Sequence, residues 1–385
     1  MIYIKLNNVD SHRFENAEIE QFKTIDYCIK SCYKNNYTGF VIYKKSVYYR
    51  NIYFESLIRN YIYMPESIMY IIIPDVYKKN IFSIDFRVQF YTKGISNKTY
   101  DFTNDRYKMS LPELENKIDN FIPGNKNHTN QIYENLYIFL LKYNLSKNID
   151  FKINPYDLSW GQNDATFVKS RPKINSLKSI LLPLEYLYLP FKVIHLIKED
   201  IHFDKKQNKI VWRGTNSGVD INHDVRASRV TLVSKYYNNS LCDIGFSDMR
   251  YKKNTIEHKN VKDFIKKNLS IKEQLNSKFI VSSEGNDFAT NLLWILLSNS
   301  IPICPIHFIE TWSMESLLEP WKHYIPVKND YSDLIRNYTI AINNNDICMN
   351  ILFYKKLFIS NFLDIDMERL VINKTINTYF NNRIH

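Results

Sequence analysis

The sequence lacks several features that define whole classes of protein. Glycine is scarce, with eight residues in 385, and there is no solenoid-period repeat or low-complexity stretch, which excludes collagen-like and repeat architectures. Five cysteines are an odd number in a long chain and fit reduced thiols in a cytosolic protein better than a disulfide framework. Cys28 and Cys32 have no second cysteine or histidine pair at ligand spacing, so no metal site is predicted.

Long apolar runs are also missing. The longest apolar region, residues 180–197, is interrupted by Pro183, Glu185, Pro190 and Lys192, so no membrane-spanning helix is predicted. The chain opens with an alternating strand pattern instead of a basic region followed by an apolar one. We therefore expect a cytoplasmic protein, whose basic balance also suits peripheral contact with an anionic membrane surface.

The charge balance narrows the choice of partner without settling it. Lysine and arginine outnumber aspartate and glutamate by 51 to 40, a formal net charge of +11. This suits a nucleic acid, a membrane surface or a phosphorylated small molecule. Nucleic-acid-binding proteins gather basic residues on one helix or stripe, whereas lysine pairs recur here along the whole chain. We expect no nucleic-acid partner, and a basic nucleic-acid-binding protein is kept as an alternative.

Alternating strand and helix patterns predict an α/β protein with parallel sheet. The length gives a prior of about two to three domains. Prolines at 183–190 and a polar run at 198–209 indicate a boundary near residue 200, so we expect domains over 1–198 and 199–385. The patterns predict helices over 14–34, 130–143, 226–236 and 289–297, and strands over 39–43, 150–153, 209–212, 278–282 and 301–304.

The segment Ile210–Gly218 (IVWRGTNSG) follows a predicted strand with residues suited to phosphate binding. Gly214 lets the backbone approach a ligand, Thr215 offers a hydroxyl, and the Arg213 guanidinium can bind phosphate in a bidentate way. The alternative is a turn without function, because many strands end in such residues.

A second segment, residues 282–291 (SSEGNDFATN), leads from a predicted strand through Gly285 into a helix. Backbone N–H groups at a helix start favour anions, so this segment is a candidate diphosphate site. The alternative is that Asp287 only caps the helix.

Asp157 follows the predicted strand over 150–153 and is flanked by Pro155 and Tyr156. Ligands of open α/β sheets bind at the carboxyl ends of the strands, where a carboxylate can act as a general base. The alternative is a residue that forms a turn or caps a helix.

Three ordered blocks of sequence carry a family resemblance. They are residues 153–159 (INPYDLS) with 167–172 (FVKSRP), 211–215 (VWRGT), and 283–294 (SEGNDFATNLLW) continuing to 310–312 (ETW) and 320–334 (PWKHYIPVKNDYSDL). Together they resemble glycosyltransferase family 90, which includes protein O-glucosyltransferases, capsule-associated xylosyltransferases and lipopolysaccharide-modifying enzymes. Residues 1–145 match no motif of the family.

The resemblance implies two Rossmann-like domains facing across a cleft, the GT-B architecture. It implies an inverting, metal-independent glycosyltransferase that needs no cofactor and moves a sugar, such as glucose or xylose, from a uridine diphosphate donor. The acceptor would be a hydroxyl of a glycan, lipopolysaccharide, capsule-type, lipid-linked or protein substrate. Asp157 stands at the position of the catalytic base, and Lys169 and Arg171 on the acceptor side. The implied nucleotide-sugar-binding residues are Arg213, Gly214, Thr215, Arg226, Arg229, Glu284, Gly285, Asn286, Asp287, Ala289, Thr290 and Asn291.

One departure from the family pattern concerns charge. The family often has an arginine in the helix start, where this chain has Asn291. The match therefore looks closer to bacterial and viral relatives that have a Glu-Gly-Asn-Asp segment, here residues 284–287. Neutralisation of the diphosphate would then shift to Arg226, Arg229 or a helix dipole. A catalytically inactive glycan- or nucleotide-binding relative is therefore a second alternative.

Overall fold

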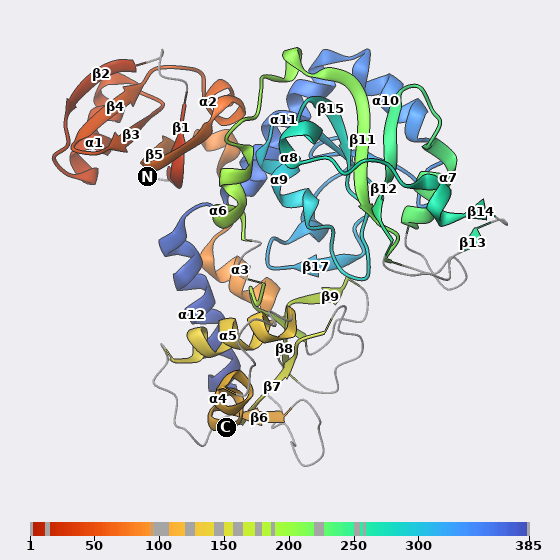
Figure 1. Cartoon of the computed structure of the whole chain (residues 1–385). Helices are drawn as coiled ribbons and strands as arrows, with labels where there is room; N and C mark the ends of the chain where they lie inside the picture. The colour runs from red at the N-terminus through yellow and green to blue at the C-terminus, as the bar shows by residue number, and fades with distance from the viewer. Residues whose placement is uncertain are drawn as a thin grey trace.

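The computed structural model describes residues 3–11, 16–93, 95, 108–119, 128–141, 150–156, 165–173, 179–185, 189–218, 227–249, 255–256 and 259–382. These residues form an α/β protein, so the predicted fold class is confirmed at this level. Sheets of four or five strands lie in three parts of the molecule (Figure 1).

The N-terminal sheet is antiparallel throughout its five strands, which are ordered β1-β5-β3-β4-β2. A two-residue turn through Lys44, at φ 55°, joins β3 to β4 and leaves no room for the crossover that parallel strands need. This part therefore differs from the Rossmann-like unit expected within residues 1–198. Its strands are β1 (Tyr3–Asp10), β2 (Asn16–Gln21), β3 (Gly39–Tyr43), β4 (Ser46–Arg50) and β5 (Ile62–Ile72), and its helices are α1 (Ile25–Asn35) and α2 (Phe54–Asn60).

The helix predicted over 14–34 is wrong in its first part. Strand β2 occupies residues 16–21, and α1 begins only at Ile25. The Tyr49 hydroxyl donates a 2.6 Å hydrogen bond to Glu20 of β2. Such a partner from β4, distant in sequence, stabilises the strand, and local periodicity does not reveal it.

The middle sheet lies below the other two in Figure 1, in the order β10-β8-β7-β6. Strands β7, β8 and β10 are parallel, and β6 is antiparallel to β7. Helix α5 confirms the prediction for 130–143. The elements of this part are η1 (Asp75–Asn80), α3 (Ile84–Tyr91), β6 (Lys108–Ser110), α4 (Leu111–Asp119), α5 (His128–Leu141), β7 (Asp150–Asn154), β8 (Thr166–Val168), β9 (Ser170–Pro172) and β10 (Ser179–Leu181).

The C-terminal sheet is parallel, in the order β12-β11-β15-β16-β18. Numbered within the sheet, this is the doubly wound order 2-1-3-4-5, whose ligand-binding switch point lies between β11 and β15. The strands predicted over 209–212, 278–282 and 301–304 are confirmed. The strands are β11 (Gln207–Thr215), β12 (Cys242–Asp248), β15 (Ser277–Val281), β16 (Ile301–Cys304) and β18 (Ile325–Pro326).

Helices and short strands complete this part of the chain. Strand β17 pairs with β9 in a separate two-stranded sheet and so joins the C-terminal half to the middle part of the chain. The other elements are α6 (Pro190–Val193), η3 (Ile194–Ile197), η4 (Phe203–Lys205), α7 (Arg229–Tyr236), β13 (Thr255–Ile256), β14 (Lys259–Asn260), η5 (Val261–Phe264), α8 (Ile271–Gln274), α9 (Asn291–Leu297), β17 (Ile309–Thr311), η6 (Glu315–Leu317), α10 (Leu334–Ile342), α11 (Asn345–Ser360) and α12 (Ile365–Asn381).

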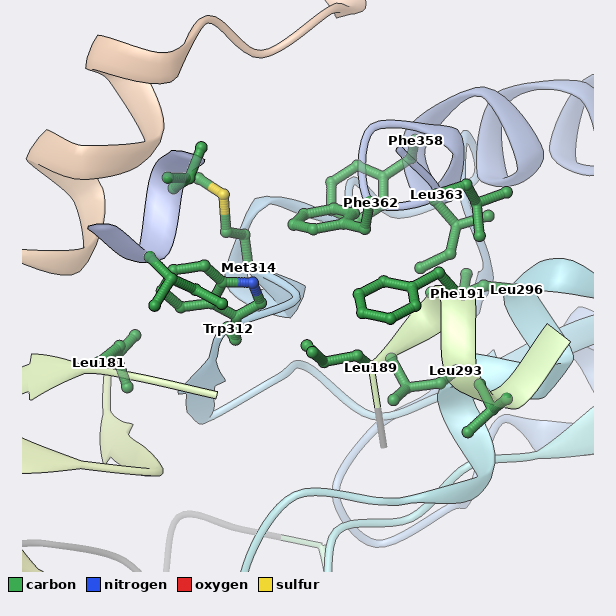
Figure 2. Packing of buried hydrophobic residues seen from close by; sticks show 14 of the residues in the cluster. Leu181, Leu189, Phe191, Leu293, Leu296, Trp312, Met314, Phe358, Phe362 and Leu363 are labelled. Carbon is green, nitrogen blue, oxygen red and sulfur yellow. The ribbon is translucent and has the colours of Figure 1, made fainter. Parts of the chain in front are cut away.

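One buried apolar cluster extends from the N-terminal sheet to α12. Figure 2 shows its centre, where Phe191 of α6 lies near Leu293 and Leu296 of α9 and below Phe362. Burying each such side chain contributes about 1.5 to 3 kcal/mol, so this shared core is expected to hold the two halves of the chain in a fixed arrangement.

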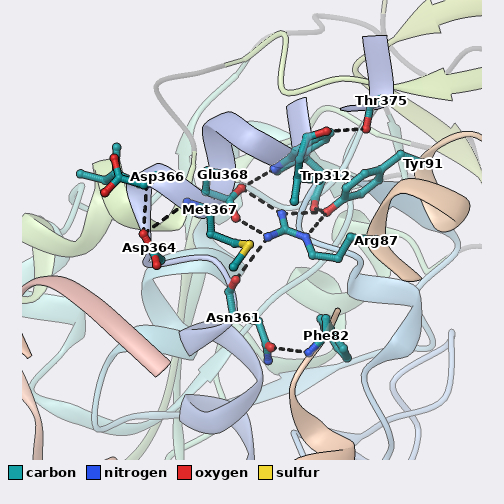
Figure 3. A network of polar contacts seen from close by, with 12 residues as sticks. Phe82, Arg87, Tyr91, Trp312, Asn361, Asp364, Asp366, Met367, Glu368 and Thr375 are labelled. Atoms are coloured by element: carbon teal, nitrogen blue, oxygen red, sulfur yellow. Dashed lines mark hydrogen bonds and ion pairs between the residues drawn. The ribbon is translucent and has the colours of Figure 1, made fainter. Parts of the chain in front are cut away.

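A buried polar network reinforces the same junction (Figure 3). The Arg87 guanidinium of α3 forms a two-pronged ion pair with Glu368 of α12, and both side chains are 1% exposed. Tyr91 donates to the Trp312 carbonyl at 2.7 Å, and the Trp312 indole donates to Glu368 at 2.6 Å. The network connects three segments far apart in sequence.

Candidate active site

A cavity of about 510 Å³ lies at the C-terminal ends of β11 and β15. These are the neighbouring strands at which the order of the sheet reverses, where doubly wound folds bind their ligands. Both segments that the sequence singles out as phosphate-binding contribute to its wall. Ten of its lining residues were predicted as site residues, namely Lys169, Arg213, Gly214, Thr215, Arg229, Gly285, Asn286, Asp287, Thr290 and Asn291.

Arg229, the first residue of α7, brings a guanidinium to the cavity wall. Its Nη2 and Nε donate to the Ser283 carbonyl at 3.0 and 3.2 Å, and its Nη1 donates to the Ser217 hydroxyl at 3.0 Å. A Cβ atom on Gly285 would lie 2.8 Å from Nη2, so only glycine leaves the guanidinium in this place. Arg229 is therefore a cation positioned by both candidate loops.

The two loops also bind each other directly. The Gly218 N–H donates to the Asn286 side-chain oxygen at 3.0 Å. Gly218 has a φ of 121°, a conformation that residues with a side chain rarely adopt. The hydroxyls of Thr215 and Ser217 lie 2.8 Å apart at the mouth of the first loop. The wall thus presents small hydroxyls and backbone groups beside Arg229, a setting suited to phosphate oxygens.

A buried ion cluster also lines the cavity. Lys169, directly after β8 and 4% exposed, places its Nζ 2.9 Å from Glu185 and 3.0 Å from Asp287. Burial raises the pKa of Asp287, and the charge of Lys169 opposes this shift. Lys169 therefore links the middle sheet to the second candidate loop.

Arg213 lines the cavity, but its guanidinium serves the scaffold. It donates to the carbonyls of Trp212, Asp243 and Lys267 at 2.8 to 2.9 Å and to the Asp243 carboxylate at 2.8 Å. A phosphate contact by Arg213 would compete with these four bonds. Arg229 is the better candidate for the donor phosphates.

The remaining residues of the second candidate loop differ in whether they line the cavity or support its wall. Asn291 donates to the Val281 carbonyl at 2.9 Å and accepts from Ser282 at 3.0 Å, which fixes the start of α9 to the end of β15. Thr290 is exposed at the cavity, whereas Ala289 is buried and does not line it.

Glu284 is also directed away from the cavity. Its carboxylate accepts the N–H groups of Phe308 and Ile309, both at 3.1 Å, and so fixes the segment before β17. Glu284 therefore connects the second candidate loop to the start of β17.

Arg171 does not reach the cavity. It is fully buried in β9, where it pairs with Glu310 at 2.9 Å and donates to the carbonyls of Phe90, Tyr91 and Ser179. Burial lowers its pKa. Arg171 therefore stabilises the fold, whereas Lys169, the other residue predicted on the acceptor side, lines the cavity.

Two predicted residues, Asp157 and Arg226, lie outside the described residues. Their predicted roles as base and phosphate ligand stay predictions. The described segment that contains β7 ends at Tyr156, one residue before Asp157. Tyr156 lies beyond the end of β7 and is 57% exposed.

Five lining residues were not among the predicted site residues: Glu185, Trp212, Ser217, Ser283 and Phe288. Ser217 and Ser283 lie inside the two segments that the sequence singled out, so a closer reading of those loops could have included them. Trp212 is 2% exposed and belongs to a buried apolar cluster beside the cavity. Glu185 pairs with Lys169 at the site, and no local pattern in the sequence predicts this contact.

Among the described residues, no His, Cys, Asp and Glu side chains gather in threes as a metal site would require. None of the described helices has the length and apolar composition needed to cross a bilayer.

Comparison with known proteins agrees with the geometry. The family model described as Glycosyl transferase family 90 matches residues 188–379, which include both candidate loops. The chain is also similar to the O-glucosyltransferase LpsA of Dichelobacter nodosus, with 29% identity over 242 residues, or 63% of this chain and 68% of the relative. The chain is thus an enzyme, a glycosyltransferase. It belongs to glycosyltransferase family 90, as the three sequence blocks indicate.

Proposed function

We propose that the enzyme transfers a sugar from a nucleoside diphosphate donor, with uridine as the preferred base, to a glycan hydroxyl with inversion at the anomeric carbon. The observation that carries this proposal is the cavity at the β11–β15 switch point, which is lined by both Arg229 and Lys169. A doubly wound sheet binds nucleotides at this point, and a guanidinium binds phosphate oxygens there. The middle and C-terminal sheets would act as the two halves of a GT-B enzyme.

The proposed reaction has one chemical step. Asp157 takes the proton of the acceptor hydroxyl, and the oxygen attacks the anomeric carbon opposite the diphosphate. A glycosidic C–O bond forms as the C–O bond to the diphosphate breaks, and that electron pair leaves with the nucleotide. Arg229 stabilises the charge that grows on the leaving phosphate.

The donor sugar in this proposal is glucose, with xylose as the alternative. Glucose is supported by the printed name of the bacterial relative, an O-glucosyltransferase. Metal independence is supported by the family resemblance and by the cations that the chain itself brings to the cavity, Arg229 and Lys169.

The test is a calorimetric screen against UDP-, GDP-, CDP- and dTDP-glucose and UDP-xylose, with and without EDTA. We expect UDP-glucose to bind with equal affinity in both conditions. At 100 times its dissociation constant it should stabilise the fold by about 2.7 kcal/mol. Absence of binding by every nucleotide sugar would refute the donor site, and binding abolished by EDTA would refute metal independence. NMR of the product anomer then tests inversion.

A further inference from the structure

A second cavity, of about 570 Å³, lies between α4, α5 and the C-terminal end of β7. It falls outside the family match, and of its lining residues Ile153, Pro155 and Tyr156 belong to the first sequence block of the resemblance. Its polar and aromatic lining residues are Lys108, Glu113, Asn116, Lys117, Tyr133 and Tyr156.

The second cavity and the donor cavity open at the same edge of the middle sheet. Strands β7 and β8 are parallel neighbours, and Asn154 is in register with Val168. The residues that follow, Pro155 and Lys169, therefore leave adjacent strands about 4.8 Å apart. Pro155 lines the second cavity and Lys169 the donor cavity.

The wall combines aromatic rings with hydrogen-bonding groups, as carbohydrate sites do. The Asn154 side chain accepts the Tyr156 N–H at 3.1 Å, which fixes the backbone that presents this exposed ring. Burial, and then the nearby Tyr156 phenol, raise the pKa of Tyr133, so the Tyr133 ring is neutral at physiological pH. The apolar faces of the two rings can stack on the C–H face of a sugar ring while the hydroxyls remain available for hydrogen bonds.

Basic groups surround the tyrosine pair. The Lys117 ammonium lies 5.7 Å from the centre of the Tyr133 ring, and an ion pair of 2.7 Å with Asp150 holds Lys108. Ammonium and amide groups can donate to the hydroxyl oxygens of a sugar, and a few converging polar groups are what fixes a ligand in a cavity.

We propose that this second cavity binds the saccharide acceptor, with a sugar ring stacked on Tyr156 and a hydroxyl directed to the edge that the two cavities share. The acceptor assignment depends on the proposed function, whereas saccharide binding at Tyr156 is testable without it. Asp157, the candidate base, is the next residue in the sequence after Tyr156.

The experiment is saturation-transfer difference NMR on the full chain. The probes are the methyl glycosides of β-glucose, β-galactose, α-mannose and β-glucuronic acid, and UDP-glucose is measured in parallel. We expect at least one glycoside to give signals with the wild type. Tyr156→Ala should weaken its binding about fivefold, and Tyr156→Phe should preserve it because the ring is kept. Tyr53→Ala, at a tyrosine that is 85% exposed and lines neither cavity, is the matched control.

The outcomes separate the two proposals. Glycoside signals that are absent from the wild type, or unchanged in Tyr156→Ala, would overturn the acceptor cavity even where UDP-glucose binds. Loss of the UDP-glucose signals in Tyr156→Ala would also overturn it, because the cavity would then hold the donor. Glycoside binding that depends on Tyr156 without any binding of UDP-glucose would keep the saccharide site and refute the proposed donor.

Discussion

Arg229 is the residue on which the donor site depends most directly. Its guanidinium faces Gly285 and bonds to Ser217 and Ser283, so it is held ready for an anion. We predict that Arg229→Gln lowers the affinity for UDP-glucose by at least about tenfold, because a charge-assisted hydrogen bond is lost. Calorimetry measures this. Arg369→Gln, at an exposed arginine of α12, is the control and should bind normally.

Asp157 is predicted to act in chemistry and not in donor binding. Asp157→Asn should reduce transfer by about 100-fold or more, the usual contribution of a general base, and leave the dissociation constant of UDP-glucose unchanged. Nucleotide release and calorimetry give the two values. Asp346→Asn, at an exposed carboxylate of α11, should retain activity. Unreduced transfer by Asp157→Asn would assign the base to another residue.

At the scale of residues, the sequence predicted which loops line the cavity better than it predicted which side chains point into it. Glycines and small polar residues after a strand are a local signal, and both such loops line the cavity. Arg213 and Arg171 have the same chemistry as Arg229, yet each is bound by carbonyls from elements distant in sequence. Which arginine faces a ligand is decided by packing, and a sequence pattern does not carry that information.

At the scale of elements, α9 is stabilised from outside its own sequence. The Nζ of Lys355, fully buried in α11, donates to the carbonyls of Ile295, Leu296 and Ser298 at the C-terminal end of α9. Burial lowers the pKa of Lys355. The short helix that begins at the donor loop is thereby fixed at its far end.

We predict that Lys355→Met lowers the free energy of unfolding by about 3 kcal/mol, because buried carbonyls lose their donor. Urea unfolding monitored by circular dichroism measures the change. Lys374→Met, at a half-exposed lysine of α12 with a 3.7 Å ion pair, should change stability by less than about 0.5 kcal/mol. Equal stability of both variants would show that the carbonyls find other partners.

Elements with a strong local pattern were predicted well. Apolar runs bounded by polar residues predicted the strands β11, β15 and β16, and helical periodicity of apolar residues predicted the helices α5 and α9. The three-residue strands β9 and β17 were not predicted, because their pairing of Arg171 with Glu310 joins segments about 140 residues apart. Short strands of this kind depend on tertiary contacts.

At the scale of the whole molecule, polar groups buried among distant segments hold the parts together. Arg87 and Glu368 connect α3 to α12, and Lys356 connects α11 to the N-terminal part. The Lys356 Nζ donates to the Arg59 carbonyl and the Asn299 side chain, both at 2.7 Å. These contacts, together with the shared apolar core, place the antiparallel N-terminal sheet against the catalytic part.

Lys356 makes this junction sensitive to pH. Burial lowers its pKa to about 7, from an ordinary value near 10.5. Between these two values the unfolded chain binds a proton that the folded chain does not, so this group destabilises the fold as the pH falls from 10.5 to 7. The free energy of unfolding should therefore rise with pH across this window by about 1 kcal/mol per unit.

Urea unfolding at pH 7, 8 and 9 tests this for the wild type and Lys356→Met. We expect the slope of stability against pH to be smaller in Lys356→Met, because the other titrating groups are common to both proteins and cancel in the comparison. Lys374→Met, at a half-exposed lysine of α12, should retain the wild-type slope. An identical slope in wild type and Lys356→Met would mean that Lys356 remains protonated in the fold, and that its ammonium is accommodated by the Arg59 and Asn299 oxygens throughout this range.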